Sequence, residues 1–230
     1  MFAITDIHGC RQSFLALLDQ IAPTRSDVLC LLGDYVAKGP DSKGVLDEIM
    51  ALQENGYRVH CLRGNHEEML LRAVRGEAAG LEGWMSDDGR TTLRSFGVKK
   101  AADLPSQYVD WLDALPYFLE TDDYILVHAG LDFSASDPLA ATGSMCWIRD
   151  WHENIRYDWL GERIILHGHQ PIPASKIRSQ FDLLGARRFL DLDGGCAFAG
   201  SKRPERADLG RLAAFDMTNR RLFFQKNVEG

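Results

Sequence analysis

The sequence lacks any apolar run of the roughly 18–20 residues that a membrane-spanning helix requires. Its first residues carry neither the basic segment nor the small-residue cleavage site of a secretory signal. A cysteine framework is missing too, because the five cysteines are odd in number, scattered, and free of any Cys-x-x-Cys pair. Such usage favours reduced thiols in a core over disulfides. Together these absences predict a cytoplasmic protein with no membrane partner.

Positive charge is also scarce. The chain has 26 lysines and arginines against 33 aspartates and glutamates, so its net charge is −7 and its pI is near 5.5. Proteins that bind a nucleic acid polymer usually carry a positive excess, so no polymer partner is expected. Internal repeats, low-complexity tracts and linkers are missing as well. The 230 residues are therefore expected to form a single domain, 1–230.

The chain does contain an alternation of short apolar runs and amphipathic stretches. Helix spacing of apolar residues is clearest at Phe14, Leu17, Leu18 and Ile21. The expected order is strand 2–4, helix 11–22, strand 28–32, helix 42–55, strand 58–62 and a helix from about 67. This alternation predicts an α/β fold with a largely parallel sheet, whose strands end at one common edge.

The second half of the chain is less regular. Glycines and charges alternate with large apolar residues over about 76–116, which predicts a mostly helical excursion over the sheet edge. Such an excursion is a natural place for substrate selection. The expected later strands are 124–127, 163–166, 188–192, 211–215 and 221–225. The charged segment 201–209 is expected to be a solvated loop.

Polar residues follow five of the expected strands. They are Asp6, His8, Asp34, Asn65, His66, His128 and His169. Carboxylates, imidazoles and one carboxamide suit Mn, Fe, Zn or Co better than Ca or a closed cysteine-zinc site. A lone histidine is more often structural, but burying unpaired polar groups at five strand ends would be costly. If one carboxylate bridges them, two metals about 3.5–4 Å apart could be held here and activate a water for in-line attack on phosphorus.

Five segments in order resemble the motifs of the calcineurin-like metallophosphoesterases, and more closely those of the phosphoprotein phosphatase branch with its small bacterial and bacteriophage members. They are Asp6-Ile7-His8-Gly9, Gly33-Asp34-Tyr35-Val36, Gly64-Asn65-His66-Glu67, His128-Ala129-Gly130 and Gly168-His169. The resemblance runs from Phe2 to about Gly200. It implies a two-layer β-sandwich flanked by α-helices, with the metal site at the carboxyl ends of the strands.

The resemblance also implies ligand sets and roles. One metal would be held by Asp6, His8 and Asp34, and the other by Asp34, Asn65, His128 and His169. The expected metals are two divalent ions, with Mn as activator and Fe or Zn as alternatives. His66 would assist the leaving oxygen, and Asn65 and Arg149 would bind phosphate. His167 falls on a non-ligand position. The alternative for Arg149 is a surface ion pair with Asp150 or Glu153.

One motif departs from the family pattern. Where the family usually continues Asp-Arg-Gly, this chain has Ala37-Lys38-Gly39. The family's Asp orients the histidine at the His66 position, and Ala37 cannot do so unless Glu67 or Asp41 substitutes. Lys38 keeps a positive charge without the planar fork of arginine. The loss should matter most for alkoxide leaving groups and less for a phenolate, whose conjugate acid has a pKa of about 10.

The main interpretation is therefore a dinuclear-metal phosphomonoester hydrolase, similar to protein phosphatases and biased to phosphotyrosine or aryl phosphates. A metal-bridging hydroxide would attack, Lys38 and Arg149 would hold the phosphate, and His66 would act at the leaving group. The partner would be a phosphorylated protein or a small phosphoester.

The alternative is a dinucleoside polyphosphate hydrolase resembling the diadenosine tetraphosphatases, which share these motifs. It would need a base-stacking cleft, for which Trp84, Trp111, Trp147 and Trp151 are candidates. A third hypothesis, a metal- and phosphate-binding protein without catalysis, ranks last because all six metal ligands are present.

Overall fold

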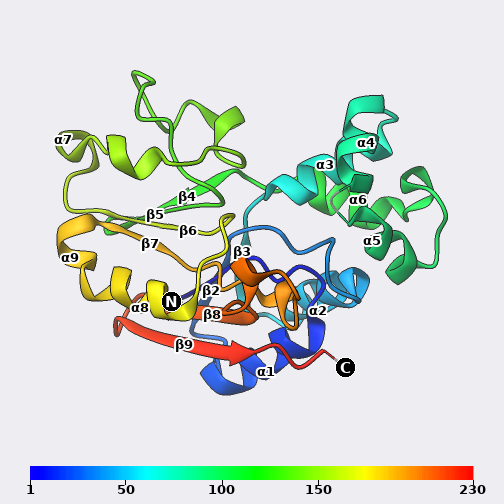
Figure 1. Ribbon diagram of the computed structural model, residues 1–230, viewed down its shortest axis with the longest axis horizontal. Helices are drawn as coiled ribbons and strands as arrows, with labels where there is room; N and C mark the ends of the chain where they lie inside the picture. Colours follow the sequence, from blue (N-terminus) through cyan, green and yellow to red (C-terminus); the bar gives the residue numbers. More distant parts are fainter. Residues whose placement is uncertain (87, 230) are drawn as a thin grey trace.

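The computed structural model describes residues 1–86 and 88–229 and contains two β-sheets (Figure 1). The strands are β1 (Phe2–Ile4), β2 (Val28–Leu31), β3 (Arg58–Cys61), β4 (Phe118–Glu120), β5 (Tyr124–Val127), β6 (Ile164–His167), β7 (Phe189–Asp191), β8 (Arg211–Asp216) and β9 (Arg221–Lys226). The α-helices are α1 (Arg11–Ile21), α2 (Ser42–Glu54), α3 (Asn65–Val74), α4 (Ala78–Ser86), α5 (Gly89–Phe96), α6 (Ser106–Asp113), α7 (Tyr157–Leu160), α8 (Ala174–Asp182) and α9 (Leu184–Arg187).

The first sheet has the order β3-β2-β1-β8-β9. Strands β1, β2 and β3 run parallel, β8 pairs with β1 in the antiparallel sense, and β9 pairs with β8 in the antiparallel sense. Side chains alternate between the two faces, as the two-residue period of a strand requires. Ile4 and Leu31 pack towards the helices, whereas Ala3, Cys30 and Phe215 pack into the second core.

The second sheet has the order β4-β5-β6-β7, with β5, β6 and β7 parallel. Leu126 and Leu166 share a buried cluster with Ala3 and Phe215 of the first sheet, so this core lies between the two sheets. Ile125 and Ile165 point the other way, into a third cluster. The expected two-layer β-sandwich flanked by helices is confirmed.

Helices α1 and α2 cover the outer face of the first sheet, where Phe14 and Ile49 are fully buried. The expected excursion over 76–116 consists of α4, α5 and α6 with a short 3-10 turn, and Figure 1 shows these helices grouped on one side of the molecule. Trp84 and Leu112 from this group join the core beneath α1 and α2. The excursion is therefore packed onto the sandwich.

Most expected elements are observed within a few residues of their expected ends, but α8, α9 and β4 were missed. No element was expected between the strands 163–166 and 188–192. Helix α8 buries only Ile177 and Gln180, so it has no apolar stripe that would have revealed it. No helix in the described ranges is both long and apolar enough to cross a membrane.

Candidate metal centre

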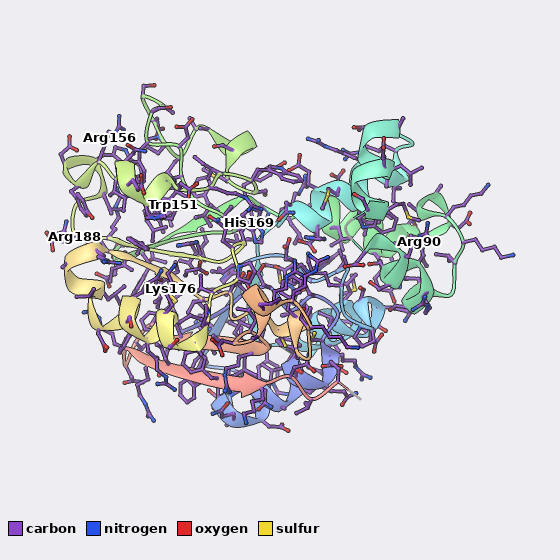
Figure 2. All side chains as sticks on the ribbon, viewed as in Figure 1. Arg90, Trp151, Arg156, His169, Lys176 and Arg188 are labelled. Carbon is purple, nitrogen blue, oxygen red and sulfur yellow. The ribbon has the colours of Figure 1, made fainter. Side chains whose placement is uncertain are left out.

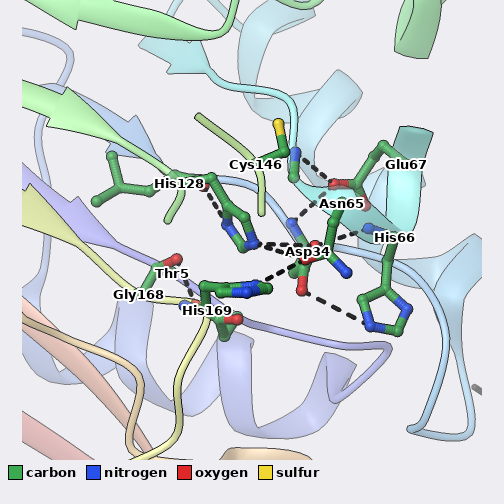
Figure 3. A network of polar contacts seen from close by, with 12 residues as sticks. Thr5, Asp34, Asn65, His66, Glu67, His128, Cys146, Gly168 and His169 are labelled. Atoms are coloured by element: carbon green, nitrogen blue, oxygen red, sulfur yellow. Dashed lines mark hydrogen bonds and ion pairs between the residues drawn. The ribbon is translucent and has the colours of Figure 1, made fainter. Parts of the chain in front are cut away.

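The candidate ligands lie where strands of both sheets end, and Figure 3 shows Asp34 at the centre of their polar network. Asp6 and His8 follow β1, Asp34 follows β2, and Asn65 opens α3 after β3. The second sheet contributes His128 after β5 and His169 after β6, and Figure 2 places His169 near the middle of the molecule. The parallel strands thus bring together residues far apart in the sequence, as expected.

One half of the network joins His8 to two carboxylates. Nδ1 of His8 donates to the carbonyl of Val36 at 2.9 Å, so Nε2 of the neutral ring presents a lone pair. That nitrogen lies 3.4 Å from Oδ2 of Asp34 and 3.8 Å from Oδ1 of Asp6. Burial and the charge of Lys38 lower the pKa of His8, which favours its neutral form. A lone pair facing two carboxylates fits a bound cation.

The other half centres on Asn65. Its Oδ1 lies 2.9 Å from Nε2 of His128 and 2.9 Å from Nδ1 of His169. Nε2 of His128 also lies 3.4 Å from Oδ1 of Asp34. Nδ1 of His128 donates to the Leu32 carbonyl at 2.9 Å, so a neutral ring offers only a lone pair at Nε2. The lone pair of His128 Nε2 therefore faces the Asn65 oxygen without a hydrogen between them, and a cation shared by the two atoms would make this contact favourable.

Burial makes the network unfavourable without a cation. Oδ1 of Asp6 and Nε2 of His169 are buried without a hydrogen-bond partner in the part of the chain that the structure describes. Burial raises the pKa of Asp34 to about 8, an effect that His66 opposes and Asp6 reinforces. Divalent cations would compensate these buried acceptors, so the residues fit the expected metal pair.

Two sets of three residues each bring their possible ligand atoms within 4.8 Å of one another. They are His8, Asp34 and His66, and Asp6, Asp34 and His128. The first group includes His66, which the family resemblance treats as a catalytic residue. Nε2 of His66 lies 2.5 Å from Nζ of Lys38 and 3.9 Å from Oδ2 of Asp34. Because its nitrogen contacts an ammonium group, we assign His66 to the substrate side of the site.

The backbone of the ligand loops is strained. Asp6, His8, Asp34 and His169 all have positive φ, between 48° and 74°. Such strain persists only where the surrounding structure holds it, and it concentrates at functional sites. The glycine of the Gly-Asn-His segment is required for steric reasons, because a Cβ at Gly64 would lie 2.2 Å from Oδ1 of Asp34. The motif spacing therefore encodes close packing of the loops as well as ligand positions.

Glu67 holds two ligand loops together. Its buried carboxylate accepts the backbone N–H groups of Asp34 and Tyr35 at 2.8 Å each, that of Gly64 at 2.9 Å and that of Val36 at 3.3 Å. Oxygens occupied in this way do not replace the missing motif carboxylate at His66. Asp41 has a capping role, because its Oδ1 accepts the N–H of Gly44 at the start of α2 at 2.8 Å.

We expect Glu67→Gln to lower the free energy of unfolding by about 1–3 kcal/mol, because its amide nitrogen would face N–H donors that then lose their acceptor. Denaturant melts of the chelator-treated protein measure this change. Glu77→Gln, at an exposed position of the same region, is the control and should be neutral. An unchanged midpoint for Glu67→Gln would contradict the structural role.

The three expected catalytic residues line one cavity of about 310 Å³. Lys38, His66 and Arg149 share its wall with the candidate ligands His8, Asp34, Asn65 and His169. The expected alternative for Arg149 is not observed, because no ion pair joins it to Asp150 or Glu153 among the described residues. The charge of Arg149 instead contributes, after burial and His128, to lowering the pKa of His169.

Four further residues line this cavity and were not predicted as site residues, namely Pro171, Asp193, Phe198 and Arg206. Arg206 lies in 201–209, which was expected to be a solvated loop. The arginines of that loop are the only sequence feature that could have indicated a role in the site. Asp193 belongs to a segment included in the family resemblance, but no role was assigned to it.

The tryptophans proposed for base stacking do not line the cavity in the described structure. Trp84 and Trp151 are buried, and Trp111 packs partly buried against the core. Trp147 is 37 % exposed, and its indole donates to Glu68 at 3.2 Å. His167, expected to be a non-ligand, packs against the ring of Trp151 with centroids 5.0 Å apart.

Residues 2–198 match the family model described as calcineurin-like phosphoesterase. The chain belongs to the calcineurin-like phosphoesterase family. This match confirms the resemblance seen in the five motifs, although it does not select the phosphoprotein phosphatase branch. A metal-binding hydrolase is therefore the established class, and the substrate has to be argued from the site.

Two relatives carry the name symmetrical bis(5'-nucleosyl)-tetraphosphatase. The one from Nitrosomonas europaea is 39 % identical over 132 residues, which is 56 % of this chain and 44 % of the relative. The one from Delftia acidovorans is 28 % identical over 238 residues, covering 96 % of this chain and 77 % of the relative. The chain thus spans less than half of the first relative and about three quarters of the second.

Solved structures share the fold at low identity. One of them is named provisionally as a diadenosine tetraphosphatase. It has a TM-score of 0.66 at 20 % identity, and the match covers 100 % of this chain and 94 % of that chain. A cold-active protein tyrosine phosphatase has a TM-score of 0.62 at 16 % identity, and the match covers 97 % of this chain and 75 % of that chain. Since both names occur on one fold, the fold alone does not distinguish the substrates.

Proposed function

We propose that this protein hydrolyses dinucleoside tetraphosphates at the central phosphoanhydride bond and releases two nucleoside diphosphates. The observation that carries the proposal is the contact between Lys38 and His66. Nε2 of His66 meets an ammonium group at 2.5 Å, and a buried alanine stands where the family usually has an acid. Since an ammonium group can only donate, Nε2 of His66 is an acceptor in this contact, and the arrangement suits a substrate whose leaving oxygen needs little proton donation.

A leaving phosphate needs little help from a proton donor. Its second pKa is about 6, whereas a phenol has a pKa of about 10 and a serine hydroxyl a higher one. An acid matters most when the leaving oxygen is basic. The Ala37-Lys38 departure therefore favours phosphoanhydrides more strongly than it favours the aryl phosphates of the main sequence-based interpretation.

The cavity also suits a highly charged substrate. Lys38, Arg149 and Arg206 line it, although the protein as a whole carries a net charge of −7. When bound, the metal pair would supply an activated water and neutralise charge on the phosphoryl oxygens. Lys38 and Arg149 would orient the attacked phosphate, and Asn65 would position it from the start of α3. The names of the relatives support the same substrate class.

The test is product analysis by ion-exchange chromatography after incubating the Mn²⁺-loaded protein with diadenosine tetraphosphate. We expect ADP as the only nucleotide product, and no turnover in excess chelator. AMP together with ATP would indicate cleavage at an outer bond and contradict the proposal.

A second candidate, hydrolysis of aryl phosphates, rests on the same contact between Lys38 and His66. Phosphotyrosine and phosphoserine peptides should therefore be assayed beside the tetraphosphate. Faster turnover of the phosphotyrosine peptide than of the tetraphosphate would favour this candidate. Binding of Mn²⁺ without turnover of any of these substrates would leave only the non-catalytic hypothesis.

A further inference from the structure

We propose that Arg206, seated on the ring of Phe198, forms a second phosphate subsite that binds the phosphate next to the one under attack. The proposal deepens the proposed function, on which it rests, by assigning its preference for polyphosphates to a particular side chain. Its ligand class is the nucleoside polyphosphates, and its position is the cavity of the metal centre.

The geometry of Arg206 is that of a preorganised anion site. Its guanidinium carbon lies 3.9 Å from the centroid of the Phe198 ring, and Nζ of Lys38 lies 6.0 Å from the same centroid. Stacking covers one face of the guanidinium and leaves the N–H groups of its edge directed outward. Both Arg206 and Phe198 line the cavity, so that edge is available to a phosphate there.

The chain that carries this pair is anchored at both ends. Phe198 ends the 3-10 turn Cys196–Phe198, and Arg206 ends the turn Pro204–Arg206. The backbone N–H groups of Gly210 and Arg211 both donate to the carbonyl of Gly194 at 3.1 Å, which closes the loop at the base of β8. An anchored loop holds the guanidinium in place before a ligand arrives, and this lowers the cost of binding.

The charge of Arg206 is not used elsewhere in the described structure. Among the side chains that the structure describes, no carboxylate forms an ion pair with Arg206. Asp193 also lines the cavity, but its Oδ1 accepts the Gly195 N–H at 2.8 Å. An arginine held on a cavity wall without an acid partner is suited to a phosphate oxygen.

The attacked phosphate already has its own partners. We assign the attacked phosphate to Lys38, Arg149 and the candidate metal ligands, which line the same cavity, so a phosphomonoester would leave Arg206 without a ligand. A polyphosphate has a further charged phosphate on either side of the attacked one. Arg206 is the third cation of the cavity, and we assign it to that neighbouring phosphate.

Calorimetric binding of ADP and AMP to the Mn²⁺-loaded protein tests this assignment without turnover. ADP has a second phosphate next to its terminal one, and AMP does not. The wild type should bind ADP more tightly than AMP. Arg206→Gln should weaken the binding of ADP about tenfold, as expected for the loss of one charge-assisted hydrogen bond. It should weaken the binding of AMP less than about twofold. Phe198→Leu should weaken the binding of ADP to a smaller extent, because the Arg206 guanidinium loses the aromatic ring on which it stacks.

Arg203→Gln is the matched control, since Arg203 is an exposed cation of the same loop that does not line the cavity among the described residues. It should bind both nucleotides as the wild type does. The assignment is overturned if the wild type does not prefer ADP, if Arg206→Gln weakens both nucleotides equally, or if Arg203→Gln has the same effect. Retention of the Mn²⁺-induced rise in melting temperature verifies that each variant is folded.

The outcomes separate the two proposals. A selective loss of ADP binding in a protein that does not cleave diadenosine tetraphosphate would support the subsite and reject the proposed function. Symmetrical cleavage by the wild type, together with an unchanged ADP preference in Arg206→Gln, would support the proposed function and reject the subsite.

Discussion

Asp34→Asn should lower turnover of diadenosine tetraphosphate by more than about 100-fold, the upper range for residues that only support metal ligands. Asp34 faces both halves of the candidate metal centre. Its Oδ2 lies 3.4 Å from Nε2 of His8, and its Oδ1 lies 3.4 Å from Nε2 of His128. An amide offers one oxygen and no charge, so it cannot bridge two cations. The Mn²⁺-induced rise in melting temperature should disappear together with the activity.

The same variant should fold well without metal. Oδ1 of Asp34 accepts the backbone N–H of His66 at 3.0 Å, and an amide oxygen can keep that bond. Burial raises the pKa of Asp34 to about 8, above the value of about 3.9 in an unfolded chain. A raised carboxyl pKa means that ionisation opposes folding. The stability advantage of the amide should therefore grow as the pH rises from about 4 to about 8 and stay constant above that.

Melting curves in chelator at pH 6 and pH 9, compared with curves in Mn²⁺, measure both effects. Asp132→Asn is the control, because this aspartate lies in the loop after His128 but pairs with Ser134. An Asp34→Asn variant that keeps its response to Mn²⁺ would show that Asp34 is not a ligand.

The positions of the candidate metal ligands were predictable because a local pattern determines them. An apolar strand followed by a polar residue places that residue at the sheet edge, and the parallel order β1-β2-β3 places several such edges side by side. The same reasoning holds for His128 and His169 after β5 and β6 in the second sheet. What the pattern did not reveal is the positive φ of Asp6 and His8, because strain depends on the packing around a loop.

Contacts between distant segments could not be predicted from local patterns. The contact of Lys38 with His66 joins residues 28 positions apart, and no periodicity encodes it. Glu67 was considered as a substitute acid, yet four backbone N–H groups already occupy its carboxylate. Arg206 lines the cavity from a loop that is closed by backbone hydrogen bonds to Gly194, and no local pattern predicts that closure. In each case the role of a side chain depends on which partner the fold brings to it.

His66→Asn should lower kcat/KM by an amount that increases with the basicity of the leaving oxygen. We expect a loss of about tenfold or less for diadenosine tetraphosphate and larger losses for the phosphotyrosine and phosphoserine peptides, which stay below the roughly 10²–10⁴-fold contribution of a fully effective general acid. The wild type itself should already prefer the three substrates in that order. Equal losses on all three would mean that His66 binds the phosphate without acting at the leaving oxygen.

The reverse change restores the acid. Ala37 has φ of 67°, a conformation that aspartate adopts more readily than alanine, so Ala37→Asp is compatible with the backbone. Its carboxylate should favour the protonated form of His66 and draw Nζ of Lys38 away from it. We expect kcat/KM to rise on the phosphoserine peptide and to change little on the tetraphosphate. Ala37→Asn is the control of equal shape without the charge. If both variants behave alike, shape rather than charge at position 37 controls the leaving group, and the link between this motif and phosphoanhydride chemistry is lost.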